Sequence, residues 1–263
     1  MAVIGAILGD ISGSQYEFES VEGRDPDTCE LFTEKCMFTD DTVMTLAVKS
    51  AVDNHRDYRE EMLRIGKMYP YCGYGGMFFN WLFGNKAGEA YGSYGNGSAM
   101  RVSYIGEYYE DLDQVKTEAA RSAEVSHNHP EGIKGAVVVA TCVWMARHGK
   151  AKQEIYDYVL SEYPPETYKY SGKTIAELCR TYQEDVSCMT SIPAAARCFY
   201  ESDSYIGFLR NIYRFSNDSD TLGAMFGGVA EECFGGTGLK NEKLLEFYLD
   251  ERLSDIVRAE LKI

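Results

Sequence analysis

The chain has 263 residues, with 26 basic and 41 acidic side chains and a formal net charge of −15. A charge of this sign opposes docking on a nucleic-acid backbone or an anionic membrane surface, so we expect neither a nucleic-acid polymer nor a membrane as a partner. The eight cysteines include no CxxC pair, which excludes zinc ribbons and thioredoxin-like redox sites and favours reduced thiols in a cytoplasmic protein. We expect that protein to be a monomer.

Helical patterns follow one another along the whole chain. The opening stretch MAVIGAILGD has the glycines of a tightly packed helix and lacks the basic residues of a signal peptide. Further helix-length patterns cover residues 43–52, 59–68, 112–125, 132–146, 152–160, 175–182, 193–200, 222–233 and 244–257. The uncharged run at 135–146 is too short for a bilayer span. Because we find no alternating strand pattern and no Pro- or Ser-rich linker, we predict one all-α domain over residues 1–263.

The pattern at 222–233 has two different faces. Apolar residues recur on one face at the spacing of an amphipathic helix. The opposite face carries small residues, namely Gly223, Ala224, Gly227 and Gly228. This second face would allow another backbone to approach closely.

An acidic motif, Thr39-Asp40-Asp41-Thr42, stands directly before the helical pattern at 43–52. Threonine and aspartate are good N-caps, and carboxylates in a first turn are stabilised by the helix dipole, so a capped helix is the simplest interpretation. Successive helical residues point about 100° apart, however, and two adjacent aspartates cannot cap the same N–H groups. One carboxylate is therefore left without a capping role.

A second acidic motif, Asp218-Ser219-Asp220-Thr221, opens the pattern at 222–233, and by itself it also fits a turn or a cap. An EF-hand is excluded because the glycine and glutamate of that loop are absent. Together the two motifs offer hard oxygen ligands, which suit Mg²⁺, Mn²⁺ or Ca²⁺ rather than zinc. If the motifs meet, the repulsion among their carboxylates predicts one or two divalent cations between them.

Two glycine-rich stretches, residues 73–76 and 92–101, lie between the acidic motifs. Such stretches are more often plain turns, but backbone N–H groups free of side chains also bind phosphate. Nearby tyrosines favour a nucleotide-like ligand.

In the stretch SHNHP, His127 and His129 lack a third zinc ligand nearby, so we interpret them as contacts to a ligand or to a helix start. Near the N-terminus, Asp10 and Glu17 flank a Gly–Ser loop, where Glu17 is a candidate acid or base.

The stretches GAILGDISGSQYEF, FTDDTVM, GSYGNGSAMR, SHNHP and DSDTLGAMFGGVA occur in this order and cover most of the chain. In this combination the chain resembles the ADP-ribosylglycohydrolase family. The resemblance implies an all-α orthogonal helical bundle with two Mg²⁺ or Mn²⁺ ions. It implies hydrolysis of the glycosidic bond between ADP-ribose and an acceptor, in an ADP-ribosylated protein or small molecule. The alternative is a non-catalytic ADP-ribose-binding or structural protein on the same scaffold.

The resemblance also implies roles for individual residues. The implied metal ligands are Thr39, Asp40, Asp41, Asp218, Asp220 and Thr221. The implied substrate-binding residues are Gly75, Gly76, Ser93, Tyr94, Gly95, Asn96 and His127. The implied catalytic carboxylates are Glu17, Asp41 and Asp220, and the sequence leaves open which of them is the base.

Three features compare the chain with branches of this family and with the family's common pattern. The stretch GSYGNGSAMR is most similar to the branch that acts on serine-linked ADP-ribose and poly(ADP-ribose), whereas the two acidic motifs are shared with arginine-specific branches. Before the second motif the family commonly has two glycines, and this chain has Ser216 and Asn217. Glu231 and Glu232 stand where the family has small residues, which we interpret as a local change of the surface.

Overall fold

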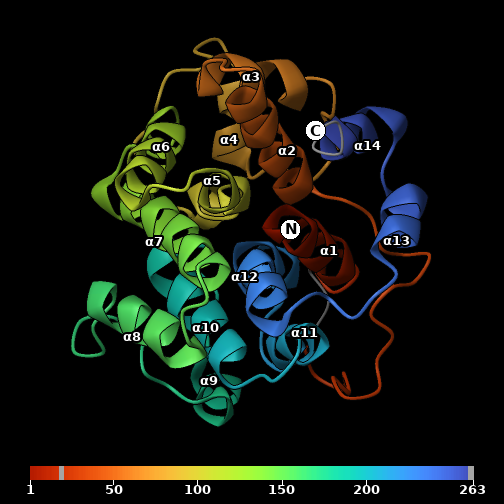
Figure 1. Cartoon of the computed structure of the whole chain (residues 1–263), viewed down its shortest axis with the longest axis vertical. Coiled ribbons are helices and arrows are strands. Elements are labelled where there is room, and N and C mark those ends of the chain that lie inside the picture. Colours follow the sequence, from red (N-terminus) through yellow and green to blue (C-terminus); the bar gives the residue numbers. More distant parts are fainter. Residues whose placement is uncertain (18–20, 260–263) are drawn as a thin grey trace.

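The computed structural model describes residues 1–17 and 21–259. Within these ranges the secondary structure consists of fourteen α-helices and one 3₁₀ helix, with no β-strand. The helices α1 and α12 lie at the centre, and the others surround them in several directions rather than as one parallel bundle (Figure 1). The prediction of an all-α fold is therefore confirmed.

The elements follow in chain order. They are α1 (Ala2–Ser14), α2 (Asp40–Asp53), α3 (Tyr58–Gly66), α4 (Gly76–Phe83), the 3₁₀ helix η1 (Asn96–Ser98), α5 (Ser103–Tyr108), α6 (Leu112–Glu124), α7 (Pro130–Arg147), α8 (Lys152–Glu162), α9 (Ile175–Thr181), α10 (Cys188–Tyr200), α11 (Tyr205–Tyr213), α12 (Ser219–Phe234), α13 (Asn241–Tyr248) and α14 (Glu251–Arg258).

The C-terminal pattern at 244–257 forms two helices instead of one. Leu249 adopts an extended backbone that ends α13, and the Asp250 side chain then caps α14 by accepting the N–H of Leu253 at 2.9 Å. The sequence patterns also do not predict α4, α5 and α11, which are six to nine residues long. These helices depend on tertiary packing more than on a long apolar stripe.

Glycines allow α1 and α12 to pack backbone against backbone. A Cβ atom added to Gly9 would lie 2.3 Å from the carbonyl oxygen of Gly223, and one added to Gly5 would lie 2.4 Å from that of Gly227. Side chains at these positions would force the helices apart. At the end of the same seam Gly13 meets the backbone of Asp220, so the close packing places the start of α12 beside the C-terminal half of α1.

Glu231 corrects one expectation from the sequence. Its side chain is only 5% exposed, because α1 covers this part of α12. One carboxylate oxygen accepts the N–H of Gly5 at 2.6 Å, and the other lies 3.6 Å from the amino group of Met1. The interpretation as a surface change is wrong for Glu231, which is part of the seam between the two central helices.

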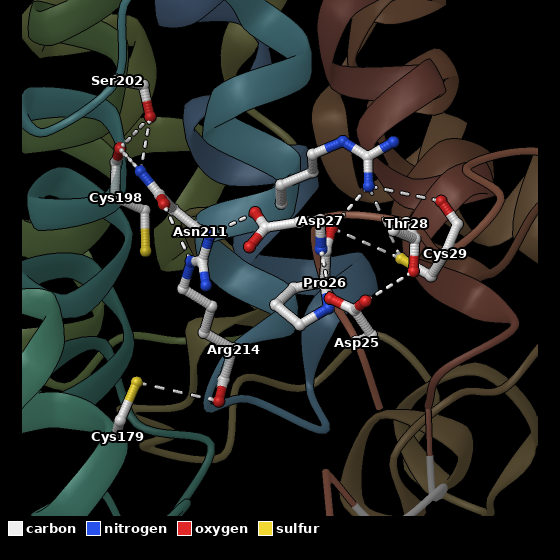
Figure 2. Close-up of polar contacts among 11 residues, drawn as sticks. Asp25, Pro26, Asp27, Thr28, Cys29, Cys179, Cys198, Ser202, Asn211 and Arg214 are labelled. Atoms are coloured by element: carbon white, nitrogen blue, oxygen red, sulfur yellow. Dashed lines mark hydrogen bonds and ion pairs between the residues drawn. The ribbon is translucent and has the colours of Figure 1, made fainter. Parts of the chain in front are cut away.

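Residues 25–29, which belong to the connection between α1 and α2, are fastened to α11 and the residue that follows it. Arg214 forms an ion pair with Asp27 (Figure 2). Arg210 donates hydrogen bonds to the carbonyl oxygens of Pro26 and Cys29. Both arginines thus hold the connection through its backbone or its carboxylate. This attachment holds residues 26–29 against α11 and Arg214.

All eight cysteines are free thiols, as expected from their spacing. Among residues 1–17 and 21–259, none of the helices combines the length and the apolar character that a bilayer crossing requires. The buried hydrophobic side chains form a core cluster to which both central helices contribute.

Candidate metal and ligand site

The first acidic motif begins α2, and Thr39 is its N-cap. The Thr39 hydroxyl accepts the N–H of Asp41 at 3.2 Å. The cap is therefore supplied by the threonine, and neither aspartate is needed for it. Asp41 is buried, with 2% of its surface exposed, whereas Asp40 is partly exposed in the wall of a cleft. Both carboxylates are available for another role.

Asp10 on α1 fixes the backbone of this motif. Its carboxylate is fully buried and accepts hydrogen bonds from the N–H and hydroxyl of Thr39, at 3.0 and 2.8 Å. It also accepts the N–H of Thr42 at 3.0 Å and the Thr42 hydroxyl. In the sequence, Asp10 stands near Glu17, and no role was assigned to it from the sequence. Its partners could not be found from the sequence because they lie on another helix.

The second acidic motif meets the first across the α1–α12 seam. Carboxylate oxygens of Asp10, Asp41 and Asp220 all lie within 4.8 Å of one another. The Thr221 hydroxyl lies 3.3 Å from the Asp41 carboxylate, although the two residues are 180 positions apart. The fold thus forms one oxygen-rich cluster from the two motifs.

Burial and mutual repulsion make this cluster unfavourable for full ionisation. Burial is the largest cause that raises the pKa of Asp41 and of Asp220 well above the usual range, and neighbouring carboxylates add to it. Burial together with the Asp10 and Glu17 charges raises the pKa of Asp40 to about 8. A bound cation would reverse these shifts by stabilising the ionised carboxylates.

Two unpartnered oxygens show that the cluster fits a cation. In the described part of the chain, no hydrogen-bond donor reaches Oδ1 of Asp41 or Oδ1 of Asp220, and both atoms are buried. A buried carboxylate oxygen without a partner is costly, so such atoms usually have a ligand. Carboxylate and hydroxyl oxygens are the ligands preferred by Mg²⁺ and Mn²⁺.

A cleft of about 400 Å³ joins the acidic cluster to the glycine-rich stretches. It brings together most of the residues selected from the sequence: Glu17, Asp40, Asp41, Gly75, Gly76, Ser93, Gly95, Asn96, His127, Asp218, Asp220 and Thr221. Two others lie elsewhere. Thr39 is buried behind the cluster, and the Tyr94 ring is half-exposed and packs against His129, with ring centroids 5.3 Å apart. Their implied roles in binding stay predictions.

Both glycine-rich stretches line the cleft, at the starts of α4 and η1. Gly75 is the N-cap of α4 and Gly76 its first residue, and open space surrounds the position of a Cβ atom at each. Gly95 caps η1 in the same way, without a side-chain cap. The Asn96 amide group donates to the Asp218 carboxylate at 2.7 Å, which links this stretch to the second acidic motif. The start of α4 favours anionic groups.

The two histidines of the SHNHP stretch have different positions. His127 is buried in the cleft wall, its Nδ1 lies 2.8 Å from the Ser126 hydroxyl, and burial lowers its pKa well below the usual range, with a further contribution from Arg101. It is therefore neutral. His129 caps α7 by accepting the N–H of Glu131 at 3.1 Å, which confirms the expected role at a helix start.

Arg101 also lines the cleft and was not selected from the sequence. It is fully buried, and its Nη2 donates to the Ser122 carbonyl at 2.8 Å and to the Ser126 hydroxyl at 3.0 Å. Within residues 1–17 and 21–259, its Nε and Nη1 atoms have no hydrogen-bond partner. Burial lowers its pKa to about 10, so the side chain remains a cation at neutral pH. The only sequence signal was its place at the end of GSYGNGSAMR.

Glu17 lies in the cleft wall just after α1. Burial, reinforced by the Asp218 charge, raises its pKa to about 7, and a hydrogen bond with Asp220 opposes this shift. Arg24 donates hydrogen bonds to the carbonyl oxygens of Tyr16, at 3.3 Å, and Ser216, at 3.4 Å. It thereby links the backbone next to Glu17 to the backbone before the second acidic motif. A carboxyl with a pKa near 7 exchanges protons readily at neutral pH.

Comparisons with known proteins agree with this geometry. The sequence model of the ADP-ribosylglycohydrolase family matches residues 1–258. ADP-ribosylhydrolase ARH3 of Mus musculus is 29% identical, in an alignment that covers 88% of this chain and 82% of the relative. ARH3 of Homo sapiens is 28% identical, with 88% and 84% covered.

A solved structure shows the same fold. A chain of an ADP-ribosylglycohydrolase-related protein complex superposes with a TM-score of 0.74, at 18% identity, and covers 97% of this chain and 93% of its own length. The family match spans both acidic motifs and the glycine-rich stretches between them, which the fold gathers around one cleft. The chain therefore belongs to the ADP-ribosylglycohydrolase family.

Proposed function

We propose that this protein hydrolyses the glycosidic bond between ADP-ribose and an acceptor, with two Mg²⁺ or Mn²⁺ ions in the acidic cluster. The observation that carries the proposal is the meeting of Asp41 and Asp220, each with one buried oxygen that no donor in the described residues reaches. A structural protein would not need to keep two such oxygens, because an unpartnered buried carboxylate is costly. The family membership supports the same activity.

The cleft has complementary features for ADP-ribose. Backbone N–H groups at the start of α4 suit the diphosphate, and the buried Arg101 cation adds favourable charge. Aromatic side chains, Phe78 and Tyr91, line the same cleft and suit a nucleobase. In this arrangement the distal ribose reaches the acidic cluster, where the cations would be held by Asp40, Asp41, Asp218, Asp220 and the hydroxyls of Thr39 and Thr221.

The chemistry follows general glycoside hydrolysis. The bond between the anomeric carbon of the ribose and the acceptor breaks, water supplies the new oxygen, and a proton reaches the acceptor. Bound divalent cations supply positive charge that orients ribose hydroxyls and activates water. The buried carboxylates stabilise the positive charge that develops on the ribose. Glu17 is the proposed acid or base, because its carboxyl lies in the cleft wall beside Asp218 and Asp220; Asp41 and Asp220 are the alternative bases.

The test is hydrolysis of serine-, arginine- and nucleobase-linked ADP-ribose by the full chain, with Mg²⁺, with Mn²⁺ and with EDTA. We expect release of ADP-ribose only with a divalent cation. We expect serine-linked substrates to react fastest, because GSYGNGSAMR is similar to the branch that acts on them. Binding of ADP-ribose by calorimetry, without release from any substrate, would instead establish the non-catalytic alternative.

We further propose that the protein works in the cytoplasm as a single-domain monomer. The eight free cysteines support a reducing compartment. The core cluster that includes both central helices supports a single domain. Size-exclusion chromatography with light scattering tests the monomer, and a dimer at micromolar concentration would contradict it.

A further inference from the structure

Glu184, in the connection between α9 and α10, binds the backbone of the second acidic motif. One of its carboxylate oxygens accepts three hydrogen bonds of 2.6 Å each, from the Ser216 hydroxyl, the Asn217 N–H and the Asp218 N–H. Consecutive backbone N–H groups of this kind form a concave anion-binding site. Here a carboxylate of the same chain fills it.

The same connection also holds the glycine-rich stretch. Two residues after Glu184, the carbonyl oxygen of Val186 accepts the N–H of Asn96 at 2.9 Å. The Asn96 amide group in turn donates to the Asp218 carboxylate at 2.7 Å. Glu184, Asp218, Asn96 and Val186 therefore form a closed circuit of contacts around one side of the cleft. Three separate segments of the chain are fixed relative to one another by it.

The backbone of this connection is constrained. Val186 has a φ of 50°, a region that β-branched residues rarely adopt. Asp185 accepts hydrogen bonds from the N–H and hydroxyl of Ser187, at 3.0 and 2.7 Å, and so holds the turn on its other side. The carboxylate of Glu184 is thus presented from a rigid turn to its three donors. Strained positions of this kind concentrate at functional sites.

One of the three donors is a side chain, and the other two are backbone N–H groups. Ser216 donates a hydrogen bond from its hydroxyl, which a glycine at this position would lack. The Ser216 carbonyl oxygen also accepts a hydrogen bond from Arg24. Without Glu184, the N–H groups of Asn217 and Asp218 would lose their common acceptor, and the backbone before α12 would be free to reorient. The direction of the Asp218 side chain depends on that backbone.

We propose that Glu184 is a positioning residue that fixes Asp218 toward the acidic cluster and thereby increases its affinity for divalent cations. This inference rests on the proposed function, because Asp218 acts there as a cation ligand. Residues that orient metal ligands typically change metal affinity by about 10- to 100-fold when they are substituted.

The experiment is calorimetric titration of the full-length protein with Mn²⁺ alone. We expect Glu184→Ala to weaken Mn²⁺ binding by about 10- to 100-fold. Glu184→Gln keeps an oxygen acceptor, so its loss should be smaller. Ser216→Ala removes one of three donors and should weaken binding by about 2- to 10-fold. Glu166→Ala removes an exposed carboxylate elsewhere and should leave binding within about twofold of the parent.

Two further measurements separate positioning from a merely structural role. High Mn²⁺ concentrations should restore most of kcat to a Glu184→Ala variant whose unfolding temperature in EDTA equals that of the parent protein, because Mn²⁺ would also stabilise a variant that is merely less stable. Thermal unfolding in EDTA reports on the fold itself. If Glu184→Ala does not fold, Ser216→Ala carries the test.

The outcomes are distinguishable. Unchanged Mn²⁺ affinity in Glu184→Ala, or in Ser216→Ala if the first variant does not fold, would overturn the inference and leave the proposed function intact. Mn²⁺ binding by the parent protein without hydrolysis of any ADP-ribose substrate would overturn the proposed function alone, since the affinity comparison would still decide the role of Glu184. Absence of Mn²⁺ binding by the parent protein would overturn both.

Discussion

The two ends of the α1–α12 seam both contain buried carboxylates, but their surroundings differ. Near the start of α1, Glu231 accepts the N–H of Gly5 and faces the amino group of Met1. At the other end, Asp41 and Asp220 each keep a buried oxygen for which the described residues supply no donor. Burial is similar at both ends, so burial by itself does not distinguish a structural carboxylate from a functional one. The presence or absence of donors within the chain does.

The largest difference between the two ends is expected in catalysis. Asp220→Asn removes a carboxylate from the acidic cluster, which we propose holds the cations, so we expect kcat/KM to fall by on the order of 10³-fold. The unfolding temperature in EDTA should not fall, because the substitution also removes repulsion among carboxylates. Glu231→Gln is the matched control at the other end, and its kcat/KM should be unchanged. Equal losses of activity in both variants would contradict the assignment of catalysis to the acidic end alone.

The seam that joins the two ends can be broken directly. In Gly9→Ala the new Cβ atom would meet the Gly223 carbonyl oxygen at 2.3 Å, so the helices must separate. We expect the free energy of unfolding to fall by about 3 kcal/mol, measured by denaturant titration. Gly76→Ala is the control, since its Cβ atom would lie in open space at the start of α4. A stable Gly9→Ala variant would show that the close packing is not required.

Cation binding should stabilise only the acidic end. At a concentration 100 times the dissociation constant, Mg²⁺ or Mn²⁺ should increase the free energy of unfolding by about 2.7 kcal/mol, and EDTA should reverse the change. Differential scanning calorimetry measures this as a rise in unfolding temperature. Glu231→Gln should keep the full response and Asp220→Asn should lose most of it. A response that survives in Asp220→Asn would place the cation elsewhere.

At the other end, Glu231 should contribute a pH dependence of its own, which Glu231→Gln removes. Burial raises the pKa of Glu231 from 4.5 to about 7, so between these values the folded protein holds a proton that the unfolded chain has released. The contribution of Glu231 to stability therefore falls as the pH rises through this window. Relative to the parent protein, Glu231→Gln should gain about 3 kcal/mol from pH 4.5 to pH 7.5, measured by urea titration. A constant difference between the two proteins would contradict this assignment.

Much of the fold follows from patterns within single helices. The long amphipathic segments, the caps at Thr39 and His129 and the small face of α12 are local properties, and the structure confirms them. The short helices α4, α5 and α11 and the break at Leu249 are not predicted, because tertiary packing rather than a long apolar stripe stabilises them. The expectation of a surface position for Glu231 was wrong because its cover comes from another helix.

The sequence by itself determined that the chain is helical, that two acidic motifs begin helices with more carboxylates than caps require, and that glycine-rich stretches lie between them. Only the tertiary structure decided that Asp41 and Asp220 share a cluster, that Asp10 holds the first motif and that Arg101 faces the cleft. The physical reason is that capping and amphipathicity act between residues a few positions apart. Charge compensation in the cluster acts between residues 180 positions apart, which approach each other only because glycines let α1 and α12 pack closely.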